Sequence, residues 1–102
     1  MDTIDQYNPD TLHTYLHTSL GLLHCLLVRR HWKDVDCIFA DLWSAAPLQS
    51  AENAHSTHFR AGVYMQYNGS RWTIIRTPHN KFNTPYWLEL EKLLNTIISI
   101  NE

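Results

Sequence analysis

Hydrophobic and polar positions alternate through residues 59–76 on both sides of Asn68 and Gly69. Alternation places successive side chains on opposite faces of a strand, and Asn-Gly favours a tight hairpin turn because both residue types tolerate positive φ. A two-residue loop would pair Tyr67 with Ser70. The pattern therefore predicts a β-hairpin whose apolar face consists of Ala61, Val63, Met65, Trp72 and Ile74.

The opposite face of this hairpin is polar and cationic. Arginine and tyrosine are enriched at protein interfaces, although an ordinary solvated sheet face has a similar mixture and is the simpler interpretation. The apolar face needs a cover because an isolated hairpin is only marginally stable in water. The candidate partner-binding residues, taken from this face and the segment after it, are Arg60, Tyr64, Gln66, Arg71, Arg76 and Lys81.

Residues 8–32 have apolar positions at helical spacing, preceded by a short lead-in at residues 1–7. Asn8 suits an N-cap and Pro9 the first helical position, and basic residues follow at the far end, where cations suit the helix dipole. The pattern predicts one long helix with an apolar stripe. Its members are Leu12, Leu16, Leu20, Leu23 and Leu27, widened by Tyr15, Leu22 and Leu26.

A second helix is predicted between Asp34, as its cap, and Pro47, which would end it. Apolar residues at positions 35, 38, 39, 42 and 43 have the i, i+3, i+4, i+7 spacing of an amphipathic helix. A strand over residues 35–39 is the alternative. The aspartates at 34, 36 and 41 are interpreted as solvated and not as a paired acid-base site.

A third helix is predicted to begin with Thr84 as its N-cap and Pro85 at its first position. Its apolar side, Tyr86 to Ile100, should cover the hairpin, while Glu89, Glu91, Lys92, Asn95 and Ser99 should face water. The expected fold is α+β. It is a single domain of residues 1–102 with two N-terminal helices, an antiparallel hairpin, and a C-terminal helix packed on one face of a small sheet.

Histidines recur at spacings of 4, 7 and 7 in the first predicted helix, which would place them in one column beside the apolar stripe. A metal site or a pH-sensitive interface is conceivable, but zinc needs three or four convergent ligands, which one column does not supply. We expect a boundary role and no metal. The four residues are His13, His17, His24 and His31.

The size and charge of the chain and its cysteine content limit the classes of protein to which it can belong. The chain has 102 residues, 44% of them hydrophobic and 18% charged, as in a globular domain. Its net charge is −2, yet residues 55–85 contain four cationic residues and no acidic one.

Cys25 and Cys37 are expected to be buried thiols, with a bridge between them left open. No membrane span or secretory signal is evident, so a cytoplasmic location is expected.

Motifs for catalysis are not found: the chain has no glycine-rich phosphate loop, no paired Cys-x-x-Cys and no Gly-x-Ser-x-Gly. We therefore expect no cofactor and no enzyme activity, but a small protein-binding module of the adaptor, inhibitor or immunity type. A homo-oligomer is left open, and nucleic-acid binding by the basic hairpin is the alternative. The aromatic residues expected to be partly exposed are Trp32, Tyr64, Tyr67 and Trp87.

Overall fold

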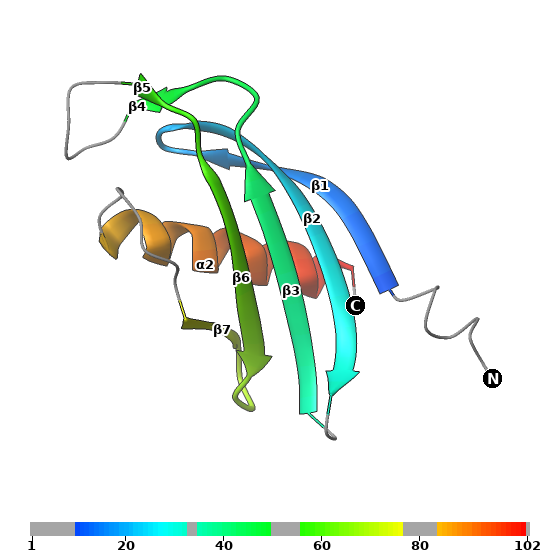
Figure 1. The fold of residues 1–102 in the computed structure, drawn as a ribbon. Coiled ribbons are helices and arrows are strands. Elements are labelled where there is room, and N and C mark those ends of the chain that lie inside the picture. The colour runs from blue at the N-terminus through cyan, green and yellow to red at the C-terminus, as the bar shows by residue number, and fades with distance from the viewer. Residues whose placement is uncertain (1–9, 33–34, 50–55, 77–83, 102) are drawn as a thin grey trace.

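The computed structural model of the chain describes residues 10–32, 35–49, 56–76 and 84–101. It contains a five-stranded antiparallel sheet of order β1-β2-β3-β6-β7 and one helix that crosses it (Figure 1). The strands of this sheet are β1 (Asp10–Thr18), β2 (Gly21–Trp32), β3 (Val35–Trp43), β6 (Arg60–Tyr67) and β7 (Trp72–Arg76). The other elements are the short pair β4 (Leu48–Gln49) and β5 (Ser56–Thr57), and the helix α2 (Thr84–Ile100).

The helix predicted over residues 8–32 is wrong, because the described part of this segment forms the hairpin of β1 and β2. A separation of four residues, as between Leu12 and Leu16, returns a side chain to the same side of a strand as well as of a helix. After the turn, odd-numbered instead of even-numbered residues lie on this side, so Leu23 and Leu27 share it with Leu12 and Leu16. Gly21 there has φ of 139°, and the hydroxyl of Thr18 donates to the Gly21 carbonyl at 2.6 Å.

The second predicted helix is also wrong, and the alternative strand is correct and longer than expected. Ile38, Ala40 and Leu42 are buried on one side of β3, while Phe39 and Trp43 are half-buried on the other. The helical spacing of the apolar residues arose because both sides of this strand are apolar. The expected fold with two N-terminal helices is therefore replaced by an architecture that is mostly sheet.

The hairpin at Asn68 and Gly69 is confirmed, but its register differs from the prediction. Tyr67 pairs with Trp72 instead of Ser70, so the loop has four residues. The Asn68 side-chain oxygen accepts hydrogen bonds from the backbone N–H groups of residues 70 and 71, both at 3.0 Å, and Gly69 has φ of 101°. Because the register differs by two residues, no side chain moves to the other face of its strand. The predicted apolar residues therefore still share one side of the hairpin.

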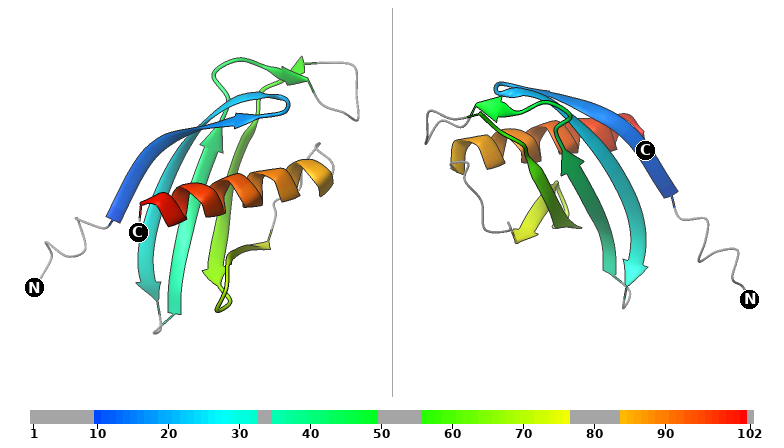
Figure 2. Two further views of the ribbon diagram at one scale, coloured as in Figure 1. Left: turned by 180° about the vertical axis from the view of Figure 1, so that it is seen from behind. Right: turned by 45° about the horizontal axis from the view of Figure 1, so that its top comes forward.

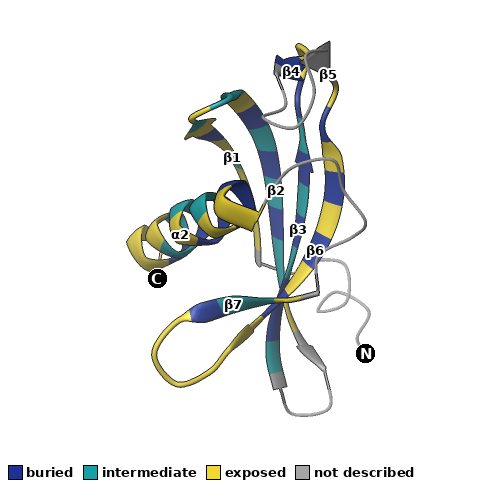
Figure 3. Ribbon diagram, turned by 90° about the vertical axis from the view of Figure 1, so that its left-hand side faces the viewer, coloured by how far each residue is buried: buried dark blue, intermediate teal, exposed yellow. Residues whose placement is uncertain are grey.

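The predicted C-terminal helix is confirmed and packs against one face of the sheet, here called the inner face (Figure 2). Leu90 and Leu94 of α2 are fully buried there. Buried and exposed residues alternate along β6 in Figure 3, as expected for a sheet covered on one side. The buried residues that the strands contribute to the inner face are Leu16, Leu23, Cys25, Leu27, Ile38, Ala40, Leu42, Ala61, Val63, Met65 and Trp72.

The first half of α2 also binds the turn between β1 and β2. The Tyr86 hydroxyl lies 2.9 Å from that of Thr18, and the backbone N–H and hydroxyl of Ser19 donate to the Glu89 carboxylate, each at 2.7 Å. Burial, with a smaller contribution from the charge of Glu89, raises the pKa of Tyr86. The turn and the helix, almost seventy residues apart in the chain, are thus held together by hydrogen bonds.

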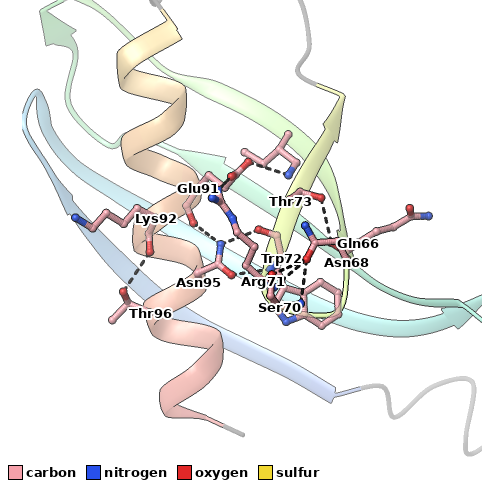
Figure 4. Close-up of polar contacts among 11 residues, drawn as sticks. Gln66, Asn68, Ser70, Arg71, Trp72, Thr73, Glu91, Lys92, Asn95 and Thr96 are labelled. Carbon is pink, nitrogen blue, oxygen red and sulfur yellow. Dashed lines mark hydrogen bonds and ion pairs between the residues drawn. The ribbon is translucent and has the colours of Figure 1, made fainter.

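Side chains of α2 close the outer edge of β7 (Figure 4). The Trp72 N–H donates to Asn95 Oδ1 at 2.7 Å, Asn95 Nδ2 donates to the Trp72 carbonyl at 2.7 Å, and the Ile74 N–H donates to Glu91 Oε1 at 3.0 Å. The expectation that Glu91 and Asn95 face water is wrong: Glu91 is buried and Asn95 half-buried. These two helix side chains thus make the backbone hydrogen bonds that a further strand would otherwise make with this edge.

Substitution of Asn95 should test this closure. Asn95→Ala removes the bonds to both backbone groups of Trp72, and we expect a loss of about 1–3 kcal/mol in the free energy of unfolding because partly buried groups lose their partners. Thr96→Ala, an exposed substitution on the neighbouring position, should change it by less than about 0.5 kcal/mol. Urea unfolding followed by circular dichroism measures both, and equal effects would contradict the assignment.

Both cysteines are free and buried, as the sequence predicted, although they lie in strands. Burial, assisted by the negative charge of Asp41, raises the pKa of Cys25 to about 12. The Cys37 thiol donates to the Arg30 carbonyl at 3.5 Å. Since the thiolate is the reactive form, Cys25 should be inert in the folded protein.

Thiol titration checks this expectation. In a Cys37→Ala variant at pH 8, Cys25 of the folded protein should react with an aromatic disulfide reagent on the order of 1,000-fold more slowly than in urea, because little thiolate forms and access is blocked. Absorbance of the released thiolate gives both rates. A folded-state rate within tenfold of the unfolded one would show that Cys25 is accessible.

Candidate functional site

The sheet face opposite α2, here called the outer face, is apolar and aromatic. Among the described residues, no helix covers it (Figures 1 and 2). An antiparallel sheet with one solvated face normally alternates apolar residues inward with polar residues outward. Here both sides of β2 and β3 are apolar. The hydrophobic and aromatic residues of the outer face are Tyr15, Leu22, His24, Leu26, Val28, Phe39, Trp43 and Tyr64.

Three rings form a row across the outer face. His24 pairs in register with Tyr15 of β1 and with Trp43 of β3. The Tyr15 and His24 rings meet edge to face with centroids 5.0 Å apart, and His24 stacks on Trp43 at 5.3 Å. Such geometries are favourable for aromatic pairs and fix the orientation of each ring. The row therefore presents a preformed aromatic surface.

A second aromatic pair joins β3 to β6. Phe39 and Tyr64 are register partners, and their rings meet edge to face at 5.3 Å. The Phe39 ring lies over Gly62, where a Cβ atom would come within 2.8 Å of Phe39 Cζ. The missing side chain at Gly62 thus leaves room for the ring. Tyr64 itself is 57% exposed beside it.

The structure brings together only part of the predicted binding set. Arg60, Tyr64 and Gln66 are exposed on the outer side of β6. Arg71 lies in the hairpin loop and forms an ion pair with Glu91 of α2, away from that face. Arg76 ends β7, while Lys81 lies outside the described residues. The assignment of these six residues to a partner remains a prediction.

Carboxylates accompany the arginines of the hairpin. The Arg60 guanidinium lies 3.5 Å from the Asp41 carboxylate on the outer face, and the Arg60 side chain is 75% exposed. Arg71 pairs with Glu91. Arg30, on the same face as Arg60, is exposed. The two arginines of the basic segment whose side chains the structure describes therefore lie on different sides of the molecule, and each is paired with a carboxylate.

The expected exposure of aromatic residues is correct for two of them and wrong for one. Tyr64 and Tyr67 are exposed. Trp87 is buried in the core, where its ring lies 5.7 Å from that of Phe59. The side chain of Trp32 lies outside the description. The outer-face rings of Tyr15, His24, Phe39 and Trp43 could not be recognised from the sequence, because they belong to the two segments predicted as helices.

The histidine column does not form as predicted, since its members lie in strands. His13 and His17 are exposed on β1, on the same face as His24. The side chain of His31 lies outside the description, as do residues 55 and 79. Within the described ranges, no group of three or more His, Cys, Asp or Glu residues could hold a metal ion.

A scan against protein-family models and searches of curated proteins and of solved structures found no match to this chain. In the part of the chain that the structure describes, no helix has both the length and the apolar character needed to cross a membrane.

Proposed function

We propose that this chain is a small, non-catalytic protein-binding module, acting as an adaptor, inhibitor or immunity-type protein, that occupies a partner's surface with its outer face. One observation carries the proposal: aromatic and aliphatic side chains from four adjacent strands are contiguous on a face that no described helix covers. Tyrosine and tryptophan contribute most to protein-protein affinity when they lie in a packed centre. The rings of this face are already ordered against one another.

The outer face also indicates the chemistry of the partner. Its centre, around Phe39 and Trp43, is half-buried and apolar, and two exposed arginines, Arg30 and Arg60, lie on the same face. Arg60 is bound only weakly by Asp41, because an exposed ion pair contributes little. Its guanidinium can therefore turn to a carboxylate of the partner. We expect a partner with an apolar patch bordered by acidic residues.

Nucleic-acid binding is the weaker alternative. Phosphate binding depends on local positive charge, and a strong binder neutralises about six to ten phosphates. Here a carboxylate lies beside Arg60, and another beside Arg71 on a different side of the sheet. Each carboxylate partly cancels the charge of its arginine, so these residues supply far less local positive charge than a strong nucleic-acid binder needs. The ion pairs therefore support a protein partner over a nucleic acid.

Crosslinking from the outer face tests the proposal. A photoreactive phenylalanine placed at position 64 should capture a discrete protein in the native source, whereas the same probe at position 88, an exposed site on α2, should not. Against the captured protein in purified form, Tyr64→Ala should weaken binding at least tenfold, because it removes an exposed ring that packs against Phe39. Leu88→Ala, of similar exposure (59% against 57%), should change it less than twofold. Titration calorimetry measures both.

Two outcomes would contradict the proposal. Equal capture from positions 64 and 88 would show that contact with the outer face is not specific. Capture that disappears after nuclease treatment, together with loss on Arg60→Glu, would show that the alternative, nucleic-acid binding, is correct.

A further inference from the structure

The two edges of the five-stranded sheet differ. On β7, the side chains of Asn95 and Glu91 bond to backbone groups that point away from β6. At the other end, β1 pairs only with β2 among the described elements, through nine consecutive register pairs. Alternate residues of such an edge strand direct their N–H and C=O groups away from the sheet, where they can pair with another strand.

β1 lacks the features that usually protect an edge strand. Proteins blunt exposed edges with lysine, proline, bulges or very short strands. Apart from Asp10 at its first position, the nine-residue strand contains no lysine, arginine, aspartate, glutamate or proline, and its register is uninterrupted. By contrast, β7 has five residues and a register shift beside it. Among the described elements, β1 is thus the longer and more regular of the two edge strands.

We propose that two copies of this chain associate through β1, antiparallel, so that their two sheets become one continuous sheet about a two-fold axis at Thr14. In this register Leu12 of one copy lies beside Leu16 of the other on the inner face, and His13 beside Tyr15 on the outer face. Thr14 meets Thr14 at the axis. The aromatic and Thr–Thr pairs are of kinds that stabilise antiparallel sheets, and the leucine pair buries apolar surface.

The composition of β1 favours a second copy over an unrelated peptide. Symmetric pairing puts identical strands side by side, and like charges directly opposite one another would oppose it. Residues 11–18 contain no lysine, arginine, aspartate or glutamate, and in this register neither histidine lies opposite a histidine of the other copy. Leu12 is only partly buried in one copy, and Tyr15 is 55% exposed, so both have surface left to bury. The strand is therefore complementary to itself.

The dimer does not rest on the proposed function, although Tyr15 belongs both to the edge strand and to the outer face. A two-fold axis perpendicular to the sheet keeps the outer faces of both copies on the same side, and Tyr64 lies on β6, three strands from the edge. The association would therefore place two copies of the outer face next to each other. Either proposal can fail without the other.

A matched pair of lysine substitutions tests the dimer. Tyr15→Lys and Tyr64→Lys change the same residue type at nearly equal exposure on the same face, one at the edge strand and one away from it. Sedimentation equilibrium of the whole chain should give twice the 12.0 kDa monomer mass at high concentration. We expect Tyr15→Lys to raise the dimer dissociation constant at least tenfold, because it places two cations near the axis, and Tyr64→Lys to change it less than twofold.

Amide hydrogen exchange provides a second measurement on the unsubstituted protein. Alternate amides of residues 12–18 should be protected at concentrations where the dimer forms and exchange faster on dilution. Exchange in this strand that does not change with concentration would overturn the proposal, as would a chain that stays monomeric. A dimer abolished by Tyr64→Lys and unaffected by Tyr15→Lys would show association through the outer face instead.

Discussion

The packing of α2 on the inner face of the sheet is the interaction on which the rest of the structure depends. A single helix can cover one face of a five-stranded sheet, and Leu90 and Leu94 supply the fully buried centre of that contact. The same helix bonds to the β1–β2 turn through Tyr86 and Glu89 and to the edge of β7 through residues 91 and 95. Since it is the only described helix, the opposite face keeps its apolar side chains without a cover. The candidate site is therefore a direct result of a two-layer architecture.

About half of the fold could be predicted from the sequence. The hairpin and α2 have strong local signals: Asn-Gly between alternating runs, and Thr-Pro before an apolar periodic segment. The segment before them lacks such signals. Residues four apart share a side in both a helix and a strand, and the turn residues between Thr18 and Gly21 do not form a recognisable turn dipeptide. Because both faces of β2 and β3 are apolar, the alternation that identifies a strand was hidden.

The same ambiguity limited the prediction of the site. Arg60, Tyr64 and Gln66 were correctly placed on one exposed side of the hairpin, because the alternation along β6 was read correctly. The rings of β1, β2 and β3 were instead assigned to helix stripes. Glu91 shows a different limit: a helical wheel places it on the solvent side, but β7 passes beneath it and gives it the Ile74 N–H and Arg71 as partners. Tertiary contacts therefore decide which arginines are available to bind a partner, and the local sequence pattern does not reveal these contacts.

The bonds between the β1–β2 turn and α2 also determine when the domain can form. Thr18 and Ser19 bond to residues 86 and 89, and all five strands of the sheet precede the helix in the chain. During synthesis the strands leave the ribosome before the helix does, so their leucine-rich inner face stays exposed to solvent until the helix follows. Contacts this far apart in sequence are slow to form. The inner face can therefore be shielded from solvent only after residues 84–100 have been synthesised and have docked on it.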